Sequence, residues 1–551
     1  MTALATRRAP RAVTIFTVAL LVAGPPLEYL RYNHYPLISP EVLLPTALWV
    51  LCAVGIGMLL NAAPRPVRIV AFSLLLLVFV DWQFSDHVEL SFKLVPVAAV
   101  AFAWLLERHF DAIAAVVLTA FYAASLLGSS PVRASRLNFV TAPKNTALPP
   151  IVYLILDEHI GVEGWPSEFA SSREMQTDIR GFYLREGFRL FGKAYSSFVE
   201  TRSSIPAVLN WPVEDPHGDV TELVPESRYR LTANATFRKL SAEGYQIRVY
   251  QSTYLDYCDV QKFAIRSCET VPTNSVANLS LHKLPPWSKA MLVGLYFLEH
   301  NSRIYAHIRD FYVAFTQRHP GWPRWDVHIY KSTMPGAVEL LGRLQRDLRA
   351  EDTRGTVYFA HLLAPHHPYE FDEACRSQAD PRRWLEIIPH PDRGTNTAAG
   401  RALRYALYAA QVGCLYRHLA SLLQTIDSLP TGRQMVVILH GDHGSRITLH
   451  YPLERLLPSM VPSDFTDAFS TLFAIRAPGI AAGYDRRFVS VDELVGRALE
   501  SGFARIEVPA TEPHVVRIEG QFAAPFHTLR LSDTSLALPS RAEGGVQVGR
   551  R

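Results

Sequence analysis

The sequence predicts two parts: an N-terminal α-helical transmembrane domain, and an α/β domain whose mostly parallel sheet is flanked by helices. Three observations predict this fold class. Apolar runs with few charges fill most of the chain before residue 130. After residue 149, short apolar runs alternate with segments of helical periodicity. Several of these short runs end in turns rich in Asp, Glu and His.

Five apolar runs near the N-terminus are the candidate spans of a membrane domain covering residues 1–130. A helix needs about 20 apolar residues to cross a bilayer, and the last three runs are shorter than that. Runs this short can span a bilayer only with tilt, neighbouring helices or flanking polar residues. With that allowance we expect about five spans. The alternatives are four spans, or a soluble protein with five buried helices. The runs are residues 12–30, 42–62, 68–82, 92–106 and 110–128.

Basic residues set the expected orientation of these spans. Three arginines precede the first run, and Arg65 and Arg68 lie between the second and the third. Because cytoplasmic loops are enriched in Lys and Arg, the N-terminus is expected in the cytoplasm. Everything after residue 130 is then extracytoplasmic. This predicts a multi-pass protein of the inner (cytoplasmic) membrane, whose second domain faces the periplasm or cell exterior.

Charge and cysteine content narrow the class of protein. The 55 Lys and Arg residues nearly balance the 51 Asp and Glu residues, and this mild, dispersed charge predicts no nucleic-acid surface. One of the 5 cysteines, Cys52, lies in an expected span. In an oxidising compartment the other four can form disulfides. The pairing considered is Cys258 with Cys268 and Cys375 with Cys414, although four cysteines allow three connectivities and free thiols remain an alternative.

The chain after the spans is expected to contain a linker, an α/β domain and a tail. Residues 131–148 are rich in Ser, Pro and Ala, which is typical of a linker. The α/β domain is expected over 149–535, and a disordered tail over 536–551. Continuous apolar runs bounded by turn residues are typical of strands buried on both faces of a parallel sheet. The expected strands are 151–156, 356–363, 435–440 and 470–475, and the expected helices are 172–187, 334–350, 400–425 and 491–501.

Three of the expected strands carry or precede residues that can bind metal or transfer protons. Ligands of open parallel sheets bind beyond the carboxyl ends of the strands, so these side chains can meet at one edge. Carboxylates combined with neutral imidazole favour Zn²⁺ or Mn²⁺. Any one of the turns alone can equally be an ordinary solvated turn. The residues are Asp157, Glu158 and His159 after the first strand; His361, His366 and His367 in and after the second; and His440, Asp442 and His443 at the third.

The segment TRSSIP, residues 201–206, offers hydroxyl groups that can act as a nucleophile. Pro206 suits the first turn of a helix. A hydroxyl at a helix N-terminus faces free backbone N–H groups, which favour an anion such as phosphate. Coordination to a metal would lower the pKa of the Thr201 hydroxyl and activate it. The alternative is that Thr201 only caps the helix.

Taken together, these segments resemble the alkaline-phosphatase superfamily, specifically its sulfatase-like, membrane-anchored branch with the phosphoethanolamine transferases and lipoteichoic acid synthases. The resemblance covers about residues 150–480. VYLILDE is similar to the first metal-binding motif, TRSSIP to the transferases' nucleophile motif, and HLLAPHHPY to a segment whose two histidines contact substrate. GDHG is the most specific match, and STLFAIRAPG resembles a strand that follows it.

The resemblance implies a role for each matching residue. Thr201 takes the place of the nucleophile, and Asp157 stands where the transferases usually have Glu. His440 and Arg446 are further candidates for contact with the substrate, although nothing in the sequence requires that role. The implied metal ligands are Asp157, Thr201, Asp442 and His443, and the implied substrate-binding residues are His361 and His366.

The resemblance also implies a reaction class. Sulfatases carry a C/S-x-P-x-R motif, whereas T-R-S-S-I has neither the Pro nor the Arg. A Thr at this place favours a metal-dependent phosphoryl-group transferase or hydrolase, which acts on a membrane lipid or envelope glycan through a phosphothreonine. The alternatives are a sulfuric ester hydrolase of the same superfamily and a non-catalytic membrane protein that retains the fold.

Overall fold

The chain forms two compact units in the computed structural model. The helical unit comprises Met1–Arg133, Asn274–Ser332 and Ala379–Glu386, and the α/β unit comprises Ala134–Thr273, Thr333–Gln378 and Ile387–Arg551. The structure describes residues 11–84, 100–101, 104, 110–127, 135–139, 143–212, 219–223, 228–258, 263–272, 276–319, 332–378, 398–508, 514–518 and 527–531.

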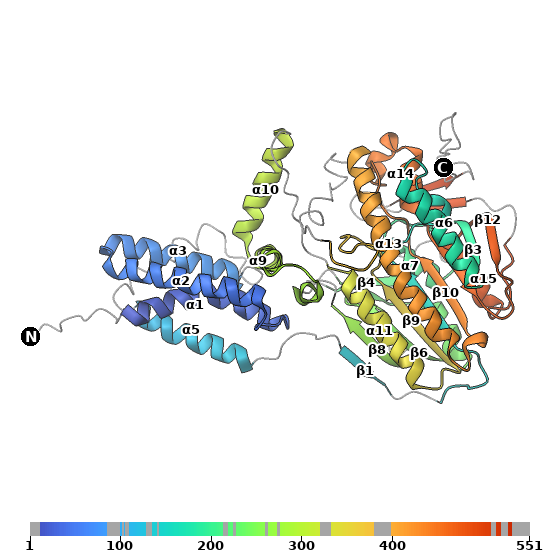
Figure 1. Ribbon diagram of the computed structural model, residues 1–551, viewed down its shortest axis with the longest axis horizontal. Coiled ribbons are helices and arrows are strands. Elements are labelled where there is room, and N and C mark those ends of the chain that lie inside the picture. The colour runs from blue at the N-terminus through green and yellow to red at the C-terminus, as the bar shows by residue number, and fades with distance from the viewer. Residues whose placement is uncertain are drawn as a thin grey trace, which may run out of the picture. The chain divides into compact units, whose positions relative to one another are not determined.

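The helical unit contains three described helices that are long and apolar enough to cross a membrane. These are α1 (Arg11–Tyr32), α2 (Pro40–Ala62) and α3 (Arg65–Phe84) (Figure 1). A shorter apolar stretch lies in α5 (Phe110–Leu127). The fifth expected span coincides with α5, while the fourth, residues 92–106, lies almost wholly outside the described residues.

Close approach and apolar side chains hold these helices together. A Cβ atom added to Gly57 of α2 would lie 2.9 Å from the Cα atom of Ile15, so only a glycine permits this helix crossing. Val18, Ala53 and Phe72 form a buried cluster between α1, α2 and α3. Large apolar side chains also face outward, including those of Leu51, Leu59 and Val116, as expected for a surface that contacts lipid.

Two further helices of the helical unit were not expected there. The helices α9 (Pro286–Asn301) and α10 (Arg303–Arg318), preceded by the short helix η3 (Val276–Leu281), belong to the segment between β8 and α11. From the sequence, this segment was expected to belong to the α/β domain over 149–535. It joins the helical unit instead because α9 packs its apolar face, including Leu292 and Tyr296, against apolar residues of α1 and α2.

The α/β unit is built on a nine-stranded mixed sheet with strand order β1-β8-β6-β9-β2-β10-β11-β3-β12. Its centre, β6-β9-β2-β10, is parallel, whereas β1 and β11 run antiparallel to their neighbours. The strands are β1 (Ser135–Asn138), β2 (Ile151–Leu156), β3 (Arg189–Tyr195), β6 (Gln246–Ser252), β8 (Ile265–Val271), β9 (Thr356–Leu362), β10 (Val436–Gly441), β11 (Phe473–Arg476) and β12 (Gly483–Ser490).

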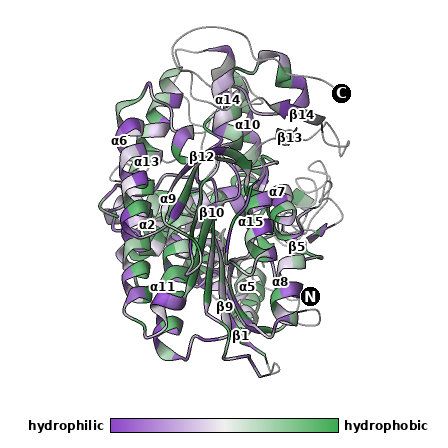
Figure 2. Ribbon diagram, turned by 90° about the vertical axis from the view of Figure 1, so that its right-hand side faces the viewer, coloured by the Kyte–Doolittle hydropathy of each residue, from purple (hydrophilic) through white to green (hydrophobic). Residues whose placement is uncertain are grey.

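Helices cover both faces of this sheet, as Figure 2 shows for α6, α11 and α13 on one side and α7, α8 and α15 on the other. The four expected helices are confirmed as α6, α11, α13 and α15. The helices are α6 (Ala170–Arg185), α7 (Thr201–Leu209), α8 (Ala235–Ala242), α11 (Met334–Ala350), α13 (Ala398–Asp427), α14 (Pro462–Phe469) and α15 (Val491–Glu500).

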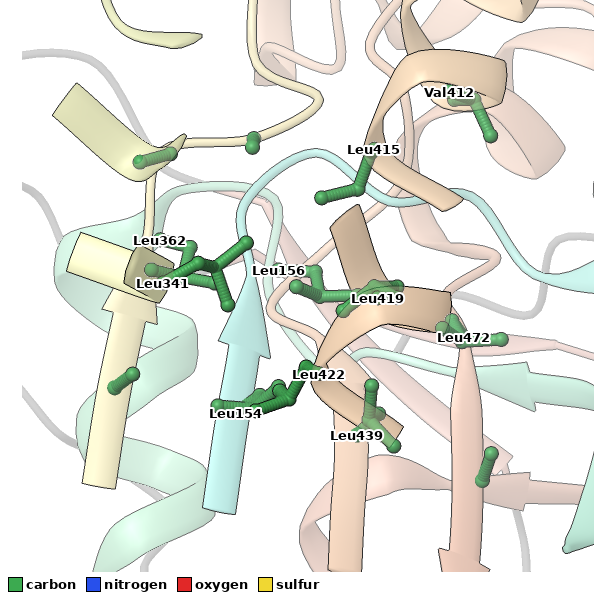
Figure 3. Packing of buried hydrophobic residues seen from close by; sticks show 14 of the residues in the cluster. Leu154, Leu156, Leu341, Leu362, Val412, Leu415, Leu419, Leu422, Leu439 and Leu472 are labelled. Atoms are coloured by element: carbon green, nitrogen blue, oxygen red, sulfur yellow. The ribbon is translucent and has the colours of Figure 1, made fainter. Parts of the chain in front are cut away.

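Burial on both faces explains why β2 is a continuous apolar run. Leu156 lies beside Leu419 of α13 and Leu154 beside Leu422 of the same helix (Figure 3), while Ile155 shares the opposite cluster with Val208 of α7. Successive side chains of a strand point to opposite faces, so a strand between two helical layers has no solvent face. Each buried leucine contributes about 1.5–3 kcal/mol.

The remaining parts are smaller. Two further sheets are formed by β4 (Val220–Leu223), β5 (Arg228–Leu231) and β7 (Leu255–Asp256), and by β13 (His514–Ile518) and β14 (His527–Leu531). Strand β1 lies within the expected linker; its backbone pairs with β8, and β1 is itself an edge strand of the nine-stranded sheet. The expected tail, 536–551, lies outside the described residues.

The expected cysteine pairing is confirmed. Cys258 is bonded to Cys268 of β8, and Cys375 is bonded to Cys414 of α13. Each disulfide restricts the unfolded chain, an effect typically worth about 2–4 kcal/mol.

Candidate active site

The carboxyl ends of three neighbouring parallel strands bring the candidate residues to one edge of the sheet. In the register of β9, β2 and β10, His361 lies beside Ile155, which lies beside His440. Asp157 directly follows β2, and Asp442 directly follows β10. Three segments far apart in the sequence therefore deliver their side chains to one place.

Asp157, His361 and Asp442 form the centre of the site. One ligand atom from each lies within 4.8 Å of the others, and all three side chains are fully buried. Within the described part of the chain, Asp157 Oδ1, Asp442 Oδ2 and both ring nitrogens of His361 make no hydrogen bond. Buried carboxylate oxygens that accept no hydrogen bond are costly. The donor set therefore fits a divalent cation such as Zn²⁺ or Mn²⁺.

His443 adds a nitrogen donor to this centre. Its Nδ1 lies 3.0 Å from the carbonyl oxygen of Gly444, which can only accept, so Nδ1 carries a proton. In the neutral ring, Nε2 then has a free lone pair. That atom lies 3.2 Å from Asp442 Oδ2 and 3.8 Å from Asp157 Oδ1.

Backbone hydrogen bonds orient Asp442. Its Oδ1 accepts from the N–H groups of Glu158, at 3.1 Å, and of His443, at 2.9 Å. This leaves Oδ2 directed at the centre of the site. Such supporting bonds hold a ligand in place before a metal binds.

Thr201 begins α7 and directs its hydroxyl into the same centre. The side chain is buried, and Oγ1 lies 3.2 Å from His443 Nε2 and 3.5 Å from Asp157 Oδ2. The capping position is occupied by Glu200, so Thr201 is the first residue inside the helix. Pro206 lies in the interior of α7, not in its first turn as the sequence analysis expected. The helix thus starts earlier, which places the hydroxyl at its N-terminus.

Burial and like charge perturb the acid–base properties of the centre. Burial, and then the carboxylate of Asp442, raise the pKa of Asp157 well above its usual range. Burial lowers the pKa of His361 to about 4, which keeps this imidazole neutral near pH 7. A cation between the carboxylates would relieve their repulsion and use the neutral nitrogen as a ligand.

A second cluster surrounds the buried carboxylate of Glu158. His367 donates its backbone N–H to Glu158 Oε2 at 3.1 Å, and its Nδ1 lies 3.2 Å from both carboxylate oxygens. His366 Nε2 lies 3.5 Å from Oε1, and Arg446 Nε donates to Oε1 at 3.0 Å. Burial raises the pKa of Glu158, but the charges of His366, His367 and Arg446 outweigh it, so the net pKa lies well below the usual range.

Arg446 links this second cluster to the start of α7. Its Nη1 lies 3.2 Å from Glu200 Oε2 and 3.3 Å from the hydroxyl of Tyr451, which itself donates to Glu200. Glu200 immediately precedes Thr201. One guanidinium group therefore joins Glu158, which follows Asp157 in the chain, to Glu200 at the N-cap position of α7.

A contact with the substrate was left open for His440, but its ring makes hydrogen-bond contacts within the core instead. Its Nδ1 lies 2.7 Å from the carbonyl oxygen of Gly441 and its Nε2 lies 2.9 Å from the hydroxyl of Tyr153. The ring is fully buried, and burial lowers its pKa to about 4. His440 is therefore a neutral core residue that packs beneath the site.

The structure thus sorts the residues singled out by the sequence. Asp157, Thr201, His361, Asp442 and His443 lie together in the centre, whereas His366 lies in the second cluster. Glu200 and Tyr451 were missed: Glu200 directly precedes TRSSIP but is not part of that motif, and Tyr451 lies beyond GDHG. Cys375, Cys414 and His418 also lie close together, but they cannot form a metal site, because both sulfur atoms are in a disulfide.

No protein-family model matches the chain, and no curated protein matches its sequence. Similar solved structures include phosphonate monoester hydrolases from Silicibacter pomeroyi (14% identity, covering 70% of this chain and 85% of that one, TM-score 0.42) and Agrobacterium radiobacter (15%, 68% and 80%, TM-score 0.39). The C-terminal periplasmic domain of EcEptC from Escherichia coli is also similar (12%, 70% and 96%, TM-score 0.40). Sulfatases occur among the similar structures as well.

Proposed function

We propose that this chain is a metal-dependent phosphoryl-group transferase or hydrolase of the alkaline-phosphatase superfamily, acting at the outer face of a membrane. The observation that carries the proposal is the position of the Thr201 hydroxyl. It lies 3.2 Å from His443 Nε2 and 3.5 Å from Asp157 Oδ2, at the N-terminus of α7 and beside buried carboxylate oxygens without hydrogen bonds. A hydroxyl that only stabilised the fold would not need this setting.

Asp157, Thr201, Asp442 and His443 would hold the metal, and His361 supplies a further neutral nitrogen beside it. A bound Zn²⁺ or Mn²⁺ would lower the pKa of the Thr201 hydroxyl and neutralise charge on the substrate's phosphate. Free backbone N–H groups at the start of α7 favour the same anion. The metal and the N-terminus of α7 would therefore both stabilise a phosphate group that is bound next to the Thr201 hydroxyl.

The reaction then follows from the residues of the chain. The Thr201 hydroxyl gives up its proton to solvent, its oxygen forms a bond to phosphorus, and the ester oxygen leaves with the electrons of the broken P–O bond and takes up a proton. Water or an acceptor alcohol next attacks the phosphothreonine, and the Thr201 oxygen is released. His366, at the edge of the second cluster, is suited to bind the phosphate or to protonate the leaving oxygen.

The membrane helices indicate the class of substrate. A chain with three helices apolar enough to span a bilayer is kept at a membrane, where lipids and lipid-linked glycans are its neighbours. We therefore propose a membrane lipid or an envelope glycan as the phosphate donor or acceptor. The buried, neutral-to-acidic site gives no reason to invoke a nucleic acid.

Turnover of matched chromogenic phosphate and sulfate esters by the full-length protein tests this proposal. We expect metal-dependent turnover of the phosphate ester and a loss of roughly 10³-fold or more in Thr201→Ala. Thr201→Ser, which keeps the hydroxyl, is the matched control and should retain measurable activity. Preferred turnover of the sulfate ester would favour a sulfatase, and equal turnover by wild type and Thr201→Ala would refute a Thr201 nucleophile.

A further inference from the structure

The α9–α10 hairpin, residues 286–318, has no role in the proposed chemistry. It matches no motif, and it interrupts the α/β unit between β8 and α11. Its helices nevertheless pack with the membrane helices in one compact unit. The chain therefore leaves the α/β unit and returns to the helical unit before it continues.

Helix α9 packs on one particular end of the membrane helices. The ring of Phe297 lies 5.5 Å from that of Tyr29 and 5.4 Å from that of Trp82. Tyr29 is near the C-terminus of α1, and Trp82 is near the C-terminus of α3. Because these two helices are separated by one helix of opposite direction, their C-termini share one end of the bundle.

Polar contacts confirm which end this is. Lys289 of α9 lies 3.4 Å from Glu41, which is in the first turn of α2 and accepts a hydrogen bond from Tyr35. Arg65 and Arg68 begin α3 and lie at the opposite end. By the excess of basic residues in cytoplasmic loops, α9 lies at the extracytoplasmic end.

Helix α10 starts where α3 ends. The Ser302 hydroxyl donates to Asp81 Oδ2 at 2.6 Å, and the N–H groups of Arg303 and Ile304 donate to Asp81 Oδ1 at 3.0 and 3.2 Å. Asp81 lies in the last turn of α3. Its carboxylate thus satisfies free N–H groups of the first turn of α10, as at a capped helix N-terminus. Figure 1 shows α10 running across the direction of α1, α2 and α3.

One face of α10 is apolar and open. Ile304, Ile308, Phe311 and Phe315 follow one another at spacings of four, three and four residues, which places them on one side of the helix. The exposed fractions of Ile308 and Phe311 are 62% and 74%. Side chains of this size are rarely left in water on an isolated helix face.

We propose that α10 is an interfacial helix, which lies in the plane of the membrane and inserts Ile308 and Phe311 into the outer leaflet of the bilayer. An amphipathic helix of this kind sinks its apolar face about 5–10 Å into the boundary between headgroups and acyl chains. Three features favour lipid as the occupant: the apolar stripe begins at the end of a membrane span, it runs crosswise to the spans, and it is fixed there by Asp81. Trp287, 66% exposed on α9, is of the residue type enriched at this depth.

Site-specific fluorescence of the full-length protein in phosphatidylcholine vesicles tests this proposal. In a Cys52→Ser background, which removes the one free cysteine of the described chain, an environment-sensitive dye is attached at Phe311→Cys. Asp310→Cys, one residue away and on another face of α10, is the matched control. We expect blue-shifted emission and quenching by a lipid spin-labelled near the headgroup at position 311, and quenching by aqueous iodide at position 310.

Other occupants give different results. Equal iodide quenching at both positions, in vesicles, would show a water-exposed helix and overturn the proposal. Shielding at position 311 without quenching by spin-labelled lipid would mean that protein covers the stripe, and shielding that varies with the protein-to-lipid ratio would identify a second copy. Ile308→Cys repeats the measurement if Phe311→Cys does not fold. None of these readouts depends on catalysis.

Discussion

Replacing Asp157 by Asn should stabilise the metal-free protein. Ligand oxygens of Asp157 and Asp442 lie within 4.8 Å of each other in the buried centre. Two negative charges at that distance repel each other by about 3.5 kcal/mol at an effective dielectric constant of about 20. An Asn side chain removes this repulsion and offers an N–H group to Asp442. The substitution should therefore raise the free energy of unfolding by up to about 3 kcal/mol in the absence of metal.

The stability gained by Asp157→Asn should depend on pH, and the pKa of Asp157 gives the direction. Burial and the charge of Asp442 raise the pKa of Asp157 above its value in the unfolded chain. A raised pKa gives stability that is complete below the unfolded pKa, about 3.9, and is lost as the pH rises through the folded pKa. The advantage of Asp157→Asn should therefore appear on raising the pH, and should be absent below about pH 4.

Thermal unfolding at pH 8, with a chelator or with Zn²⁺ or Mn²⁺, measures both effects. Metal at 1,000 times its dissociation constant should stabilise the wild type by about 4.1 kcal/mol and the variant by much less, so the order of melting temperatures reverses. Asp485→Asn is the matched control, because hydrogen bonds from Arg487 and Arg189 outweigh burial and lower the pKa of Asp485 to about 2. That variant should lose stability with or without metal. A less stable Asp157→Asn protein in chelator, with an unchanged response to metal, would refute the reasoning.

Three further predictions concern other parts of the molecule. Arg446→Met should abolish metal-stimulated turnover and lower the free energy of unfolding by about 3 kcal/mol, measured by denaturant titration, because the buried carboxylate of Glu158 loses its guanidinium partner. Arg446→Lys should recover only part of both, since one ammonium group cannot bridge two carboxylates. Cys414→Ser should lower the free energy of unfolding by about 2–4 kcal/mol under non-reducing conditions and by nothing when the wild type is also reduced. Leu419→Ala should cost about 2–5 kcal/mol, measured by denaturant titration, because it opens a cavity between α13 and the sheet.

Much of the α/β architecture could be predicted because its signals are local. The run 151–156 is apolar at every position, which only a strand covered on both faces requires, and β2 is such a strand. Asp157 and Asp442 could be singled out because each directly follows a buried strand, and His443 because it is the next residue after Asp442. Their meeting at one sheet edge follows from parallel topology, which the alternation of strands and helices already indicates.

The rest depends on contacts between distant segments. Nothing in the sequence near Arg446 indicates that its guanidinium group joins the carboxylates of Glu200, 246 residues earlier, and of Glu158, 288 residues earlier. No helix was predicted in 286–318, and the sequence of this segment does not tell which unit it packs against. Strand β1 was taken for part of a linker because four residues that pair with a sheet edge carry no apolar run of their own.

Acid quenching during turnover, followed by peptide mass spectrometry, tests the central claim most directly. The full-length protein, loaded with metal and mixed with a phosphate ester, should carry a phosphoryl group on the peptide containing Thr201, located to that residue by fragmentation. The modification should be absent in Thr201→Val, which preserves the shape of the side chain without its hydroxyl. Turnover that continues with no modified Thr201 in the wild type, or with undiminished rate in Thr201→Val, would contradict the account.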